Sequence, residues 1–184
     1  MDHYQEIRIL PDGELQPMNI LAPLFARLHM ALVEYGKGDI GISLPEHDIT
    51  PGTVIRIHGT RSALEALAIS SRLAGLQDYC LCTPLLPVPP IKGWRTVTRV
   101  QVKSNTERLL RRSLRKGWLT EEEVAHRRTE IQDRRCTSPF IQIKSASTGQ
   151  DFRLFIHHGE LSPASSDGVF SSYGLSNTAT IPWF

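Results

Sequence analysis

The sequence contains little cysteine, which argues against stabilisation by disulfide bonds and against a cysteine-rich metal site. Only three of the 184 residues are cysteines, and an odd number argues against a framework of disulfide bonds. Cys80-x-Cys82 together with Cys136 also lacks the paired spacing of a zinc site. We therefore expect a protein of a reduced, cytoplasmic setting that holds no structural metal.

Long apolar runs are missing as well. No stretch approaches the roughly 18 apolar residues of a membrane-spanning helix, and the first residues, Met1-Asp-His-Tyr-Gln-Glu, have no signal-peptide pattern. A hydrophobic content of 40% and a charged content of 22% are typical of a soluble globular protein. The length allows one large or two small domains, and we expect no association with a membrane.

Acidic residues are scarce between Trp94 and Lys116, where Glu107 stands alone among many basic residues. Alternation with period two in the first half of this segment predicts a strand. One face of this strand carries Arg95, Arg99, Gln101 and Lys103, and the other carries Trp94, Val100 and Val102.

The second half of the segment changes to the spacing of a helix. At about 100° per residue, its arginines fall within an arc of roughly 100° and its leucines point the opposite way. The arginines are Arg108, Arg111, Arg112 and Arg115, and the leucines are Leu110 and Leu114. Ser104 and Glu107 have the spacing of a capping box. We therefore expect the helix to begin at Asn105 or Thr106 and to end at Gly117.

A charged helix face is usually just solvated, but solvated faces interleave glutamate with lysine to relieve repulsion. Here like charges repeat at i, i+3, i+4 and i+7, which costs roughly a few tenths of a kcal/mol per pair. An anionic partner would offset that cost, and arginine suits bidentate contacts with phosphate. Arg99 and Gln101 could also recognise base edges, because arginine pairs with guanine and glutamine with adenine. The segment therefore predicts a surface that binds a folded nucleic acid.

The order of the elements predicts the fold of the first half. Strands are predicted at Tyr4–Leu10, Ile40–Leu44, Val54–His58 and Tyr79–Thr83, and helices at Met18–Tyr35 and Arg61–Ala74. The order β-α-β-β-α-β is that of the ferredoxin-like split βαβ unit. A boundary follows, because four prolines in seven residues cannot pair in a central strand. These prolines are Pro84, Pro87, Pro89 and Pro90.

The second half starts with the basic strand and helix. A Thr120–Glu123 capping box opens a charged helix that is expected to run to about Asp133. Further strands are predicted at Phe140–Ala146, Asp151–His157 and Val169–Leu175, with Thr148-Gly149 as a hairpin turn. We therefore predict an α+β protein. It has a ferredoxin-like domain (1–84), a proline-rich linker (85–93) and a C-terminal domain (94–184) with an arginine-rich helix and antiparallel strands.

Candidates for catalysis are few, because the acidic residues form no carboxylate cluster of the kind that two-metal nucleases use. RNA supplies its own nucleophile, the 2′-hydroxyl, so cleavage needs a proton acceptor, a group that holds the sugar and cations near the phosphate. His29, on the edge of the first helix's apolar stripe, is a candidate acceptor, although a lone histidine there is more often structural.

Hydroxyl and aromatic side chains offer further candidates near the predicted hairpin turn. Ser145, Ser147 and Thr148 could orient a substrate group, although forming the turn is the commoner role of such residues. Phe152 could stack on a base, although packing within the sheet is the commoner role of a strand aromatic.

Five blocks of sequence, in this order over essentially the whole chain, carry a family resemblance. They are Phe25-Ala-Arg-Leu-His29, Arg99-Val-Gln101-Val-Lys103-Ser-Asn105-Thr-Glu-Arg108-Leu, Ser145-Ala-Ser147-Thr-Gly-Gln-Asp-Phe152-Arg-Leu-Phe-Ile, Tyr173-Gly-Leu-Ser176 and Pro182-Trp-Phe184. Together they resemble the CRISPR-associated endoribonucleases of subtype I-F, which cut precursor CRISPR RNA at each repeat hairpin.

The resemblance implies a role for each matching residue. His29 is expected to transfer the proton that activates the 2′-hydroxyl, Ser145 to hold that ribose, and Tyr173 to line the site and orient the histidine. Arg99 and Gln101 are expected to recognise bases of the lower stem. The other RNA contacts expected are Arg108, Arg111, Arg112, Arg115 and Lys116 on the helix, and Phe152, flanked by Ser147 and Thr148, beneath the terminal base pair.

The resemblance also implies an overall activity. It implies cleavage without a metal or other cofactor at the 3′ base of the stem, a 2′,3′-cyclic phosphate product and retention of the product hairpin. It further implies membership of the subtype I-F surveillance complex, with a monomer outside it. Two residues depart from the family pattern, since Lys116 replaces an arginine and His157 replaces a basic residue.

Two other interpretations stay open. One is a non-catalytic module that binds the same kind of RNA hairpin and uses His29 structurally. It differs from the nuclease in whether His29 and Ser145 meet in space. The other is a DNA-binding regulator that places the helix of residues 105–116 in a major groove. It is the weakest reading, because no recognition helix of the helix-turn-helix type follows.

Overall fold

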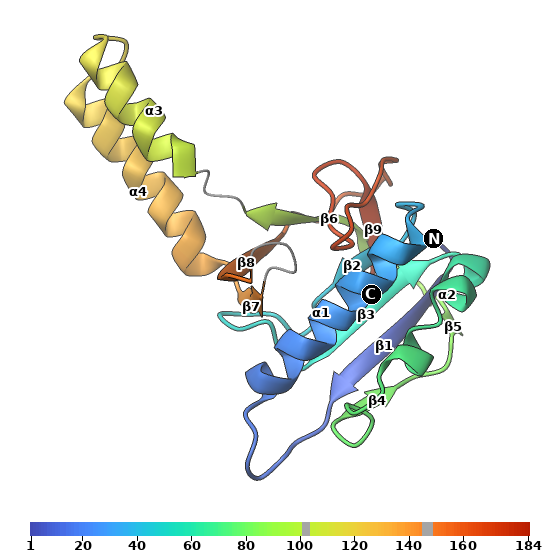
Figure 1. Ribbon diagram of the computed structural model, residues 1–184. Coiled ribbons are helices and arrows are strands. Elements are labelled where there is room, and N and C mark those ends of the chain that lie inside the picture. The colour runs from blue at the N-terminus through green and yellow to red at the C-terminus, as the bar shows by residue number, and fades with distance from the viewer. Residues whose placement is uncertain (101–103, 145–148) are drawn as a thin grey trace.

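Two antiparallel sheets and four α-helices make up the part of the chain that the computed structural model describes, which is residues 1–100, 104–144 and 149–184, with backbone alone over 104–109 and 131–137. This arrangement, drawn in Figure 1, confirms the predicted α+β class. None of the helices in these ranges combines the length and apolar character needed to cross a membrane.

The first half of the chain has the predicted β-α-β-β-α-β order of elements, and its strands form the first sheet. The elements are β1 (His3–Ile9), α1 (Pro17–Tyr35), β2 (Gly41–Ser43), β3 (Val54–Gly59), α2 (Arg61–Leu67) and β4 (Cys80–Cys82), followed by the short β5 (Leu86–Pro87). The strands lie in the order β2-β3-β1-β4, each antiparallel to its neighbour, and β5 pairs with β1. Both helices cover one face of this sheet (Figure 1).

Helix α1 forms where the apolar spacing predicted it. Its buried residues recur at i, i+3, i+4 and i+7, as a helix packed on a sheet requires. They are Ile20, Leu21, Leu24, Phe25, Leu28, Ala31 and Leu32. Pro23 lies in the second turn and is exposed, and Gly36 ends the helix with φ 68° while its N–H bonds to the Leu32 carbonyl. His29 therefore sits beside this stripe and is only partly buried.

The second helix is shorter than predicted. Arg61–Ala74 was expected to be continuous, but α2 ends at Leu67 and a 3-10 turn, η1, follows at Ile69–Arg72. Ala68 takes a left-handed conformation with φ 47°, which an α-helix cannot continue. After the break, Ile69 and Leu73 are buried in the core. The apolar spacing of this region therefore comes from two short helical segments that are both buried, and not from one continuous helix.

The second sheet comes from the C-terminal half of the chain. It contains β6 (Gly93–Val100), β7 (Phe140–Lys144), β8 (Asp151–His158) and β9 (Thr180–Trp183) in the order β7-β8-β6-β9. The antiparallel β7–β8 pair confirms that these two segments pair as predicted. Thr148 of the predicted turn lies outside the described residues, and Gly149 has φ 69°, which suits a turn.

The strand predicted at Val169–Leu175 does not form. The Gly174 N–H instead bonds to the Ser171 carbonyl at 2.8 Å and the Ser171 N–H to the Leu175 carbonyl at 2.9 Å, which closes a tight turn that we call the 171–175 turn. Phe170 and Leu175 are each buried in the core, which accounts for the misleading apolar pattern. The strand of this region is β9, which pairs with β6.

The helix of the basic segment and the helix after it form a helical hairpin that projects away from both sheets (Figure 1). Helix α3 spans Ser104–Arg115 and α4 spans Glu121–Thr137, so α4 is longer than the predicted run to Asp133. Gly117, with φ 69°, ends α3 as predicted. The Thr120–Glu123 capping box is present, whereas the predicted box of Ser104 falls on side chains outside the described part.

Apolar residues join the two helices of this hairpin. Leu110 of α3 and Val124 of α4 are both buried, and Leu114 is partly buried. Arg111, Arg112 and Arg115 are exposed, as the helical spacing predicted. The hairpin therefore has its own small apolar seam and presents the arginine face to its surroundings.

Two buried histidines lie where the sheets meet. His58 on β3 is fully buried with its Nε2 2.8 Å from the Ser43 Oγ, and the His158 Nε2 on β8 accepts the Leu44 N–H at 3.1 Å. Burial, with nearby Arg56, lowers the pKa of His58 to about 3. Burial, with His47 and Arg95 nearby, lowers the pKa of His158 to about 3. Both rings are therefore neutral in the folded protein near neutral pH.

These histidines predict a loss of stability in acid. Below about pH 6.5 the unfolded chain binds protons at both positions while the folded protein does not, so the free energy of unfolding should fall as the pH drops. Each site should contribute a slope of up to ~1.4 kcal/mol per pH unit. Urea unfolding between about pH 7 and about pH 5 measures this slope.

His158→Gln should remove about half of the histidine-linked slope in the same experiment. His157→Gln is the matched control, because His157 is the exposed neighbour on the same strand and should leave the slope unchanged. An unchanged slope in His158→Gln would contradict the assignment.

Candidate active site

His29 is held by a backbone carbonyl. Its Nδ1 lies 2.8 Å from the Ser172 carbonyl oxygen. A carbonyl oxygen can only accept a hydrogen bond, so Nδ1 must carry the proton that it donates. In the neutral imidazole the other nitrogen, Nε2, then has a free lone pair. The contact therefore fixes the ring as the tautomer whose Nε2 can take up a proton.

The Tyr173 ring holds the imidazole from the side. The two rings stack with centroids 4.1 Å apart and an angle of 4° between their planes. The same tyrosine stacks on Phe25, one turn earlier on α1, at 6.4 Å and 12°. Phe25 is fully buried, so the stack extends from the hydrophobic core to the partly exposed His29.

The 171–175 turn that carries Tyr173 is fixed to β2. The Ile42 N–H donates to the Gly174 carbonyl at 2.8 Å. Gly174 has φ 68°, and a Cβ at that position would lie 2.5 Å from Cγ1 of Ile42. Only glycine fits both this conformation and this close approach. The turn is thus anchored on the N-terminal sheet, and Tyr173 is set over His29 by that anchor.

Arg99 joins the stack from the second sheet. Its guanidinium carbon lies 5.6 Å from the centre of the Tyr173 ring and 5.3 Å from that of Phe152. Val97, two residues earlier on the same face of β6, is fully buried, so Arg99 emerges at the margin of the core. Cation–π contacts of this kind orient a guanidinium without neutralising it. His29, Tyr173, Arg99 and Phe152 therefore form one group, which we call the His29 cluster.

Four of the predicted site residues are thus brought together from α1, β6, β8 and the 171–175 turn. Other predicted residues cannot be placed in the same way. Gln101, Ser145, Ser147 and Thr148 lie outside the described residues, as does the side chain of Arg108. Strand β7, which precedes Ser145 in the chain, packs against α1.

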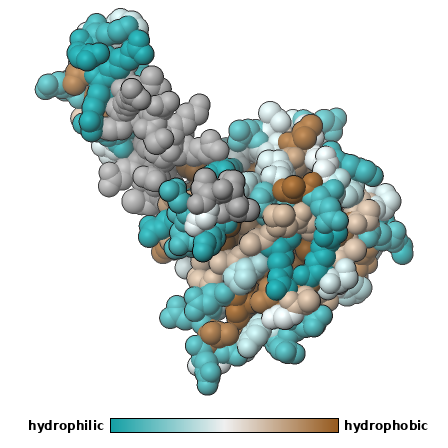
Figure 2. Space-filling model, in the orientation of Figure 1, coloured by the Kyte–Doolittle hydropathy of each residue, from teal (hydrophilic) through white to brown (hydrophobic). Residues whose placement is uncertain are grey.

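The remaining predicted residues lie apart from the His29 cluster. Arg111, Arg112 and Arg115 on α3, and Lys116 just after it, are exposed in the helical hairpin that projects from the body (Figure 1). The surface at the outer end of this hairpin is largely hydrophilic (Figure 2). The molecule therefore has two separate regions, a group built around a histidine and a projecting cationic helix.

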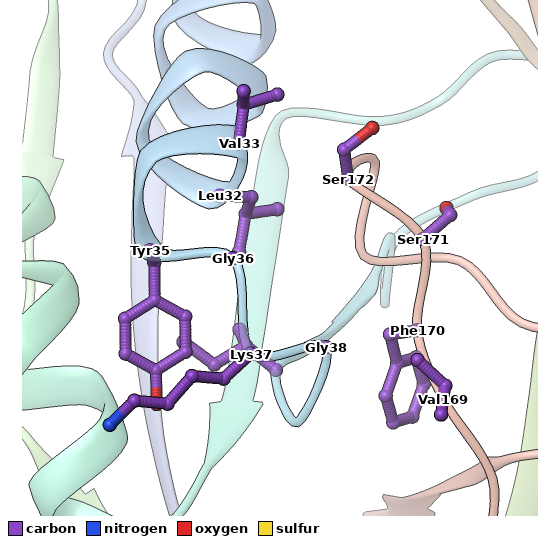
Figure 3. Close-up of a pocket in the computed structure, with 11 residues that line it drawn as sticks. Leu32, Val33, Tyr35, Gly36, Lys37, Gly38, Val169, Phe170, Ser171 and Ser172 are labelled. Carbon is purple, nitrogen blue, oxygen red and sulfur yellow. The ribbon is translucent and has the colours of Figure 1, made fainter.

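The Ser172 carbonyl could not be predicted from the sequence, because a backbone oxygen carries no side-chain signature. Ser172 also borders a pocket of about 340 Å³ between the end of α1 and residues 169–172, as Figure 3 shows. Lys37, Phe170 and Ser171 are among the residues that line it. In the part of the chain that is described, no three His, Cys, Asp or Glu side chains are grouped so that they could hold a metal ion.

Comparisons with known proteins identify the family of the chain. The family model described as CRISPR-associated protein (Cas_Csy4) matches residues 4–184. A CRISPR-associated endonuclease Cas6/Csy4 of Escherichia coli (strain UTI89 / UPEC) is 55% identical over 184 residues, covering 100% of both chains. One of the same name from Pseudomonas aeruginosa (strain UCBPP-PA14) is 43% identical over 187 residues, again covering 100% of both. The chain therefore belongs to the CRISPR-associated Cas_Csy4 family.

Proposed function

We propose that this protein is an endoribonuclease that binds CRISPR repeat hairpins and cleaves precursor CRISPR RNA at the 3′ base of the stem. Cleavage proceeds by attack of the 2′-hydroxyl without a metal ion, leaves a 2′,3′-cyclic phosphate, and is followed by retention of the product. The observation that carries the proposal is the 2.8 Å contact between His29 Nδ1 and the Ser172 carbonyl, which leaves Nε2 as a proton acceptor.

In this mechanism His29 acts as the general base. Its Nε2 takes the proton of the 2′-hydroxyl, and that oxygen attacks the adjacent phosphorus. The bond from phosphorus to the 5′-oxygen breaks, and the leaving oxygen takes up a proton. The 2′- and 3′-oxygens then share the phosphate as a cyclic diester. Ser145 holds the attacking ribose. The ring of Tyr173, stacked on the imidazole, keeps the imidazole from rotating.

The other members of the His29 cluster hold the end of the stem. Phe152 is a partly buried aromatic that can stack beneath the terminal base pair, which aligns the strand for cleavage. Arg99 contacts both Phe152 and Tyr173, so a base that it recognises is positioned next to the catalytic histidine. With Gln101 it recognises bases of the lower stem. Recognition and cleavage are thereby coupled through shared aromatic contacts.

The projecting helix α3 supplies most of the electrostatic attraction. Arg111, Arg112 and Arg115 are exposed on it, and the proposal adds Arg108 from the helical spacing. The deep major groove of an RNA duplex normally excludes side chains, so α3 requires a hairpin whose groove opens near its end or loop. A short repeat hairpin meets that requirement, whereas a long duplex does not. The protein acts within the cytoplasm and, with its product, joins the subtype I-F surveillance complex.

Cleavage without metal is the direct test of this function. Purified protein should cut a repeat hairpin in excess EDTA, and should leave uncut a hairpin with one 2′-deoxy nucleotide just upstream of the cut, since that RNA lacks the nucleophile. Gel electrophoresis of both substrates measures the outcome. Binding without cleavage would instead favour a non-catalytic RNA-binding module, and cleavage of both substrates would exclude attack by the 2′-hydroxyl.

His29→Ala should lower the cleavage rate at least about 10²-fold, because it removes the proton acceptor. Its affinity for the hairpin should stay near that of the native protein, because His29 lies apart from the arginine face of α3. Single-turnover cleavage and filter binding separate the two effects. His126→Ala is a suitable control, as His126 is exposed on α4, and comparable losses of binding and cleavage in His29→Ala would contradict this division of roles.

Replacing Arg112 and Arg115 by alanine should weaken binding and lower the slope of log affinity against log salt by about 2, one for each lost phosphate contact. The matched control removes the same charge from Arg8 and Arg61, whose side chains form surface ion pairs with Glu46 and Glu65. This control should leave the slope close to the native value. Equal slopes for the two double variants would refute the groove assignment.

A further inference from the structure

Trp118 is a large aromatic side chain left exposed at the outer end of the helical hairpin. It is 68% exposed, whereas Trp94 and Trp183 are both partly buried. The chain leaves α3 in a defined geometry at this point. The Gly117 N–H bonds to the Leu114 carbonyl at 3.0 Å and the Trp118 N–H to the Ser113 carbonyl at 2.9 Å. This pair of bonds is a Schellman motif, which fixes the backbone of Trp118 to the helix end.

One face of the indole is occupied by a cation. The Lys116 Nζ lies 4.5 Å from the centre of the Trp118 ring, in the range of a cation–π contact. Lys116 follows Arg112 by one helical turn, so the ring continues the line of positive charge on α3. With so much of its surface exposed, the indole still offers area for a second flat partner.

The surroundings favour a nucleic-acid base over a protein surface as that partner. A protein interface of this kind would be expected to surround the tryptophan with other apolar residues. Here the residues before it, Arg115, Lys116 and Gly117, are exposed, and the apolar Leu119 after it is partly buried. The surface at this end of the hairpin is largely hydrophilic (Figure 2). An aromatic ring among cations is the usual composition of a surface on which RNA bases stack.

The position along α3 selects which bases these are. The helix has 12 residues, which at about 1.5 Å per residue carries its far end roughly 18 Å from its start. The His29 cluster lies toward the opposite end of α3, because its member Arg99 is the penultimate residue of β6 and α3 follows β6 in the chain (Figure 1). If the base of the stem is held at that cluster, a stem running along α3 presents its loop to Trp118. Loop bases are unpaired and free to stack, whereas stem bases are not.

We propose that Trp118 stacks on an unpaired base in the loop of the bound RNA hairpin, with Lys116 on the other face of the indole. The inference rests on the proposed function and adds a contact at the end of the RNA opposite the cut. Trp118 thereby contributes to affinity and favours hairpins whose loop places a base within reach of the tip. It takes no part in the chemical step.

The test compares the affinity of native protein, Trp118→Ala and Trp118→Phe for one repeat hairpin and for versions with a single abasic nucleotide in the loop. Trp118→Ala should bind the intact hairpin roughly 5- to 150-fold more weakly, the range for loss of one stacked base. Trp118→Phe should retain most of the affinity, because phenylalanine can also stack. One of the hairpins with an abasic loop nucleotide should bind native protein more weakly by a similar factor. The same hairpin should bind Trp118→Ala no more weakly than the intact hairpin does.

Ile49→Ala is the matched control, because Ile49 is an exposed apolar side chain on the β2–β3 connection and its loss should not change RNA affinity. Native affinity in Trp118→Ala would overturn the inference and leave the indole to a protein partner. Equal losses from Trp118→Ala on every abasic hairpin would also overturn it, since no loop base would then be its partner. If native protein neither binds nor cuts the hairpin, the proposed function itself fails. If native protein binds and cuts the hairpin but Trp118→Ala has native affinity, only the inference about Trp118 fails.

Discussion

The stack of Tyr173 on His29 is anchored by a backbone contact between the two halves of the chain. The Ile42 N–H on β2 binds the Gly174 carbonyl, and the same turn provides the Ser172 carbonyl that accepts from His29 Nδ1. Because Gly174 approaches Ile42 too closely for any side chain, the turn has little freedom to shift. The orientation and tautomer of the histidine thus follow from how a C-terminal turn is seated on the N-terminal sheet.

The hydrophobic core makes this seating possible. A single apolar cluster includes Phe25 and Ile42 from the first half of the chain and Val97, Ile141 and Ile181 from the second. Groups at its margin are consequently held by both sheets, as Arg99 is by its contacts with Tyr173 and Phe152. Preorganisation of this kind lowers the cost of aligning a substrate, because the protein groups need not be ordered when RNA binds.

The arginines of α3 are placed away from the core, unlike the residues of the His29 cluster. The exposed arginines of α3 would repel one another within the compact body, but the hairpin of α3 and α4 carries them into solvent on an apolar seam of Leu110 and Val124. Their separation from the His29 cluster allows binding and chemistry to depend on different residues. Under the proposed function, the two regions contact the RNA at points far enough apart to respond to the length of a stem.

The sequence by itself determined the periodic features: α1 with its buried stripe, the ferredoxin-like order of elements, the arginine face of α3 and the cap at Thr120. Such features depend on local spacing, which is why they could be predicted, and the family blocks predicted His29, Tyr173, Arg99 and Phe152 as site residues. The division at residues 84 and 94 stays a prediction. Only the tertiary structure decided that α2 breaks at Ala68, that residues 169–175 form a turn, and that a backbone carbonyl orients His29. These depend on contacts between segments distant in the chain, for which neither periodicity nor side-chain identity gives a signal.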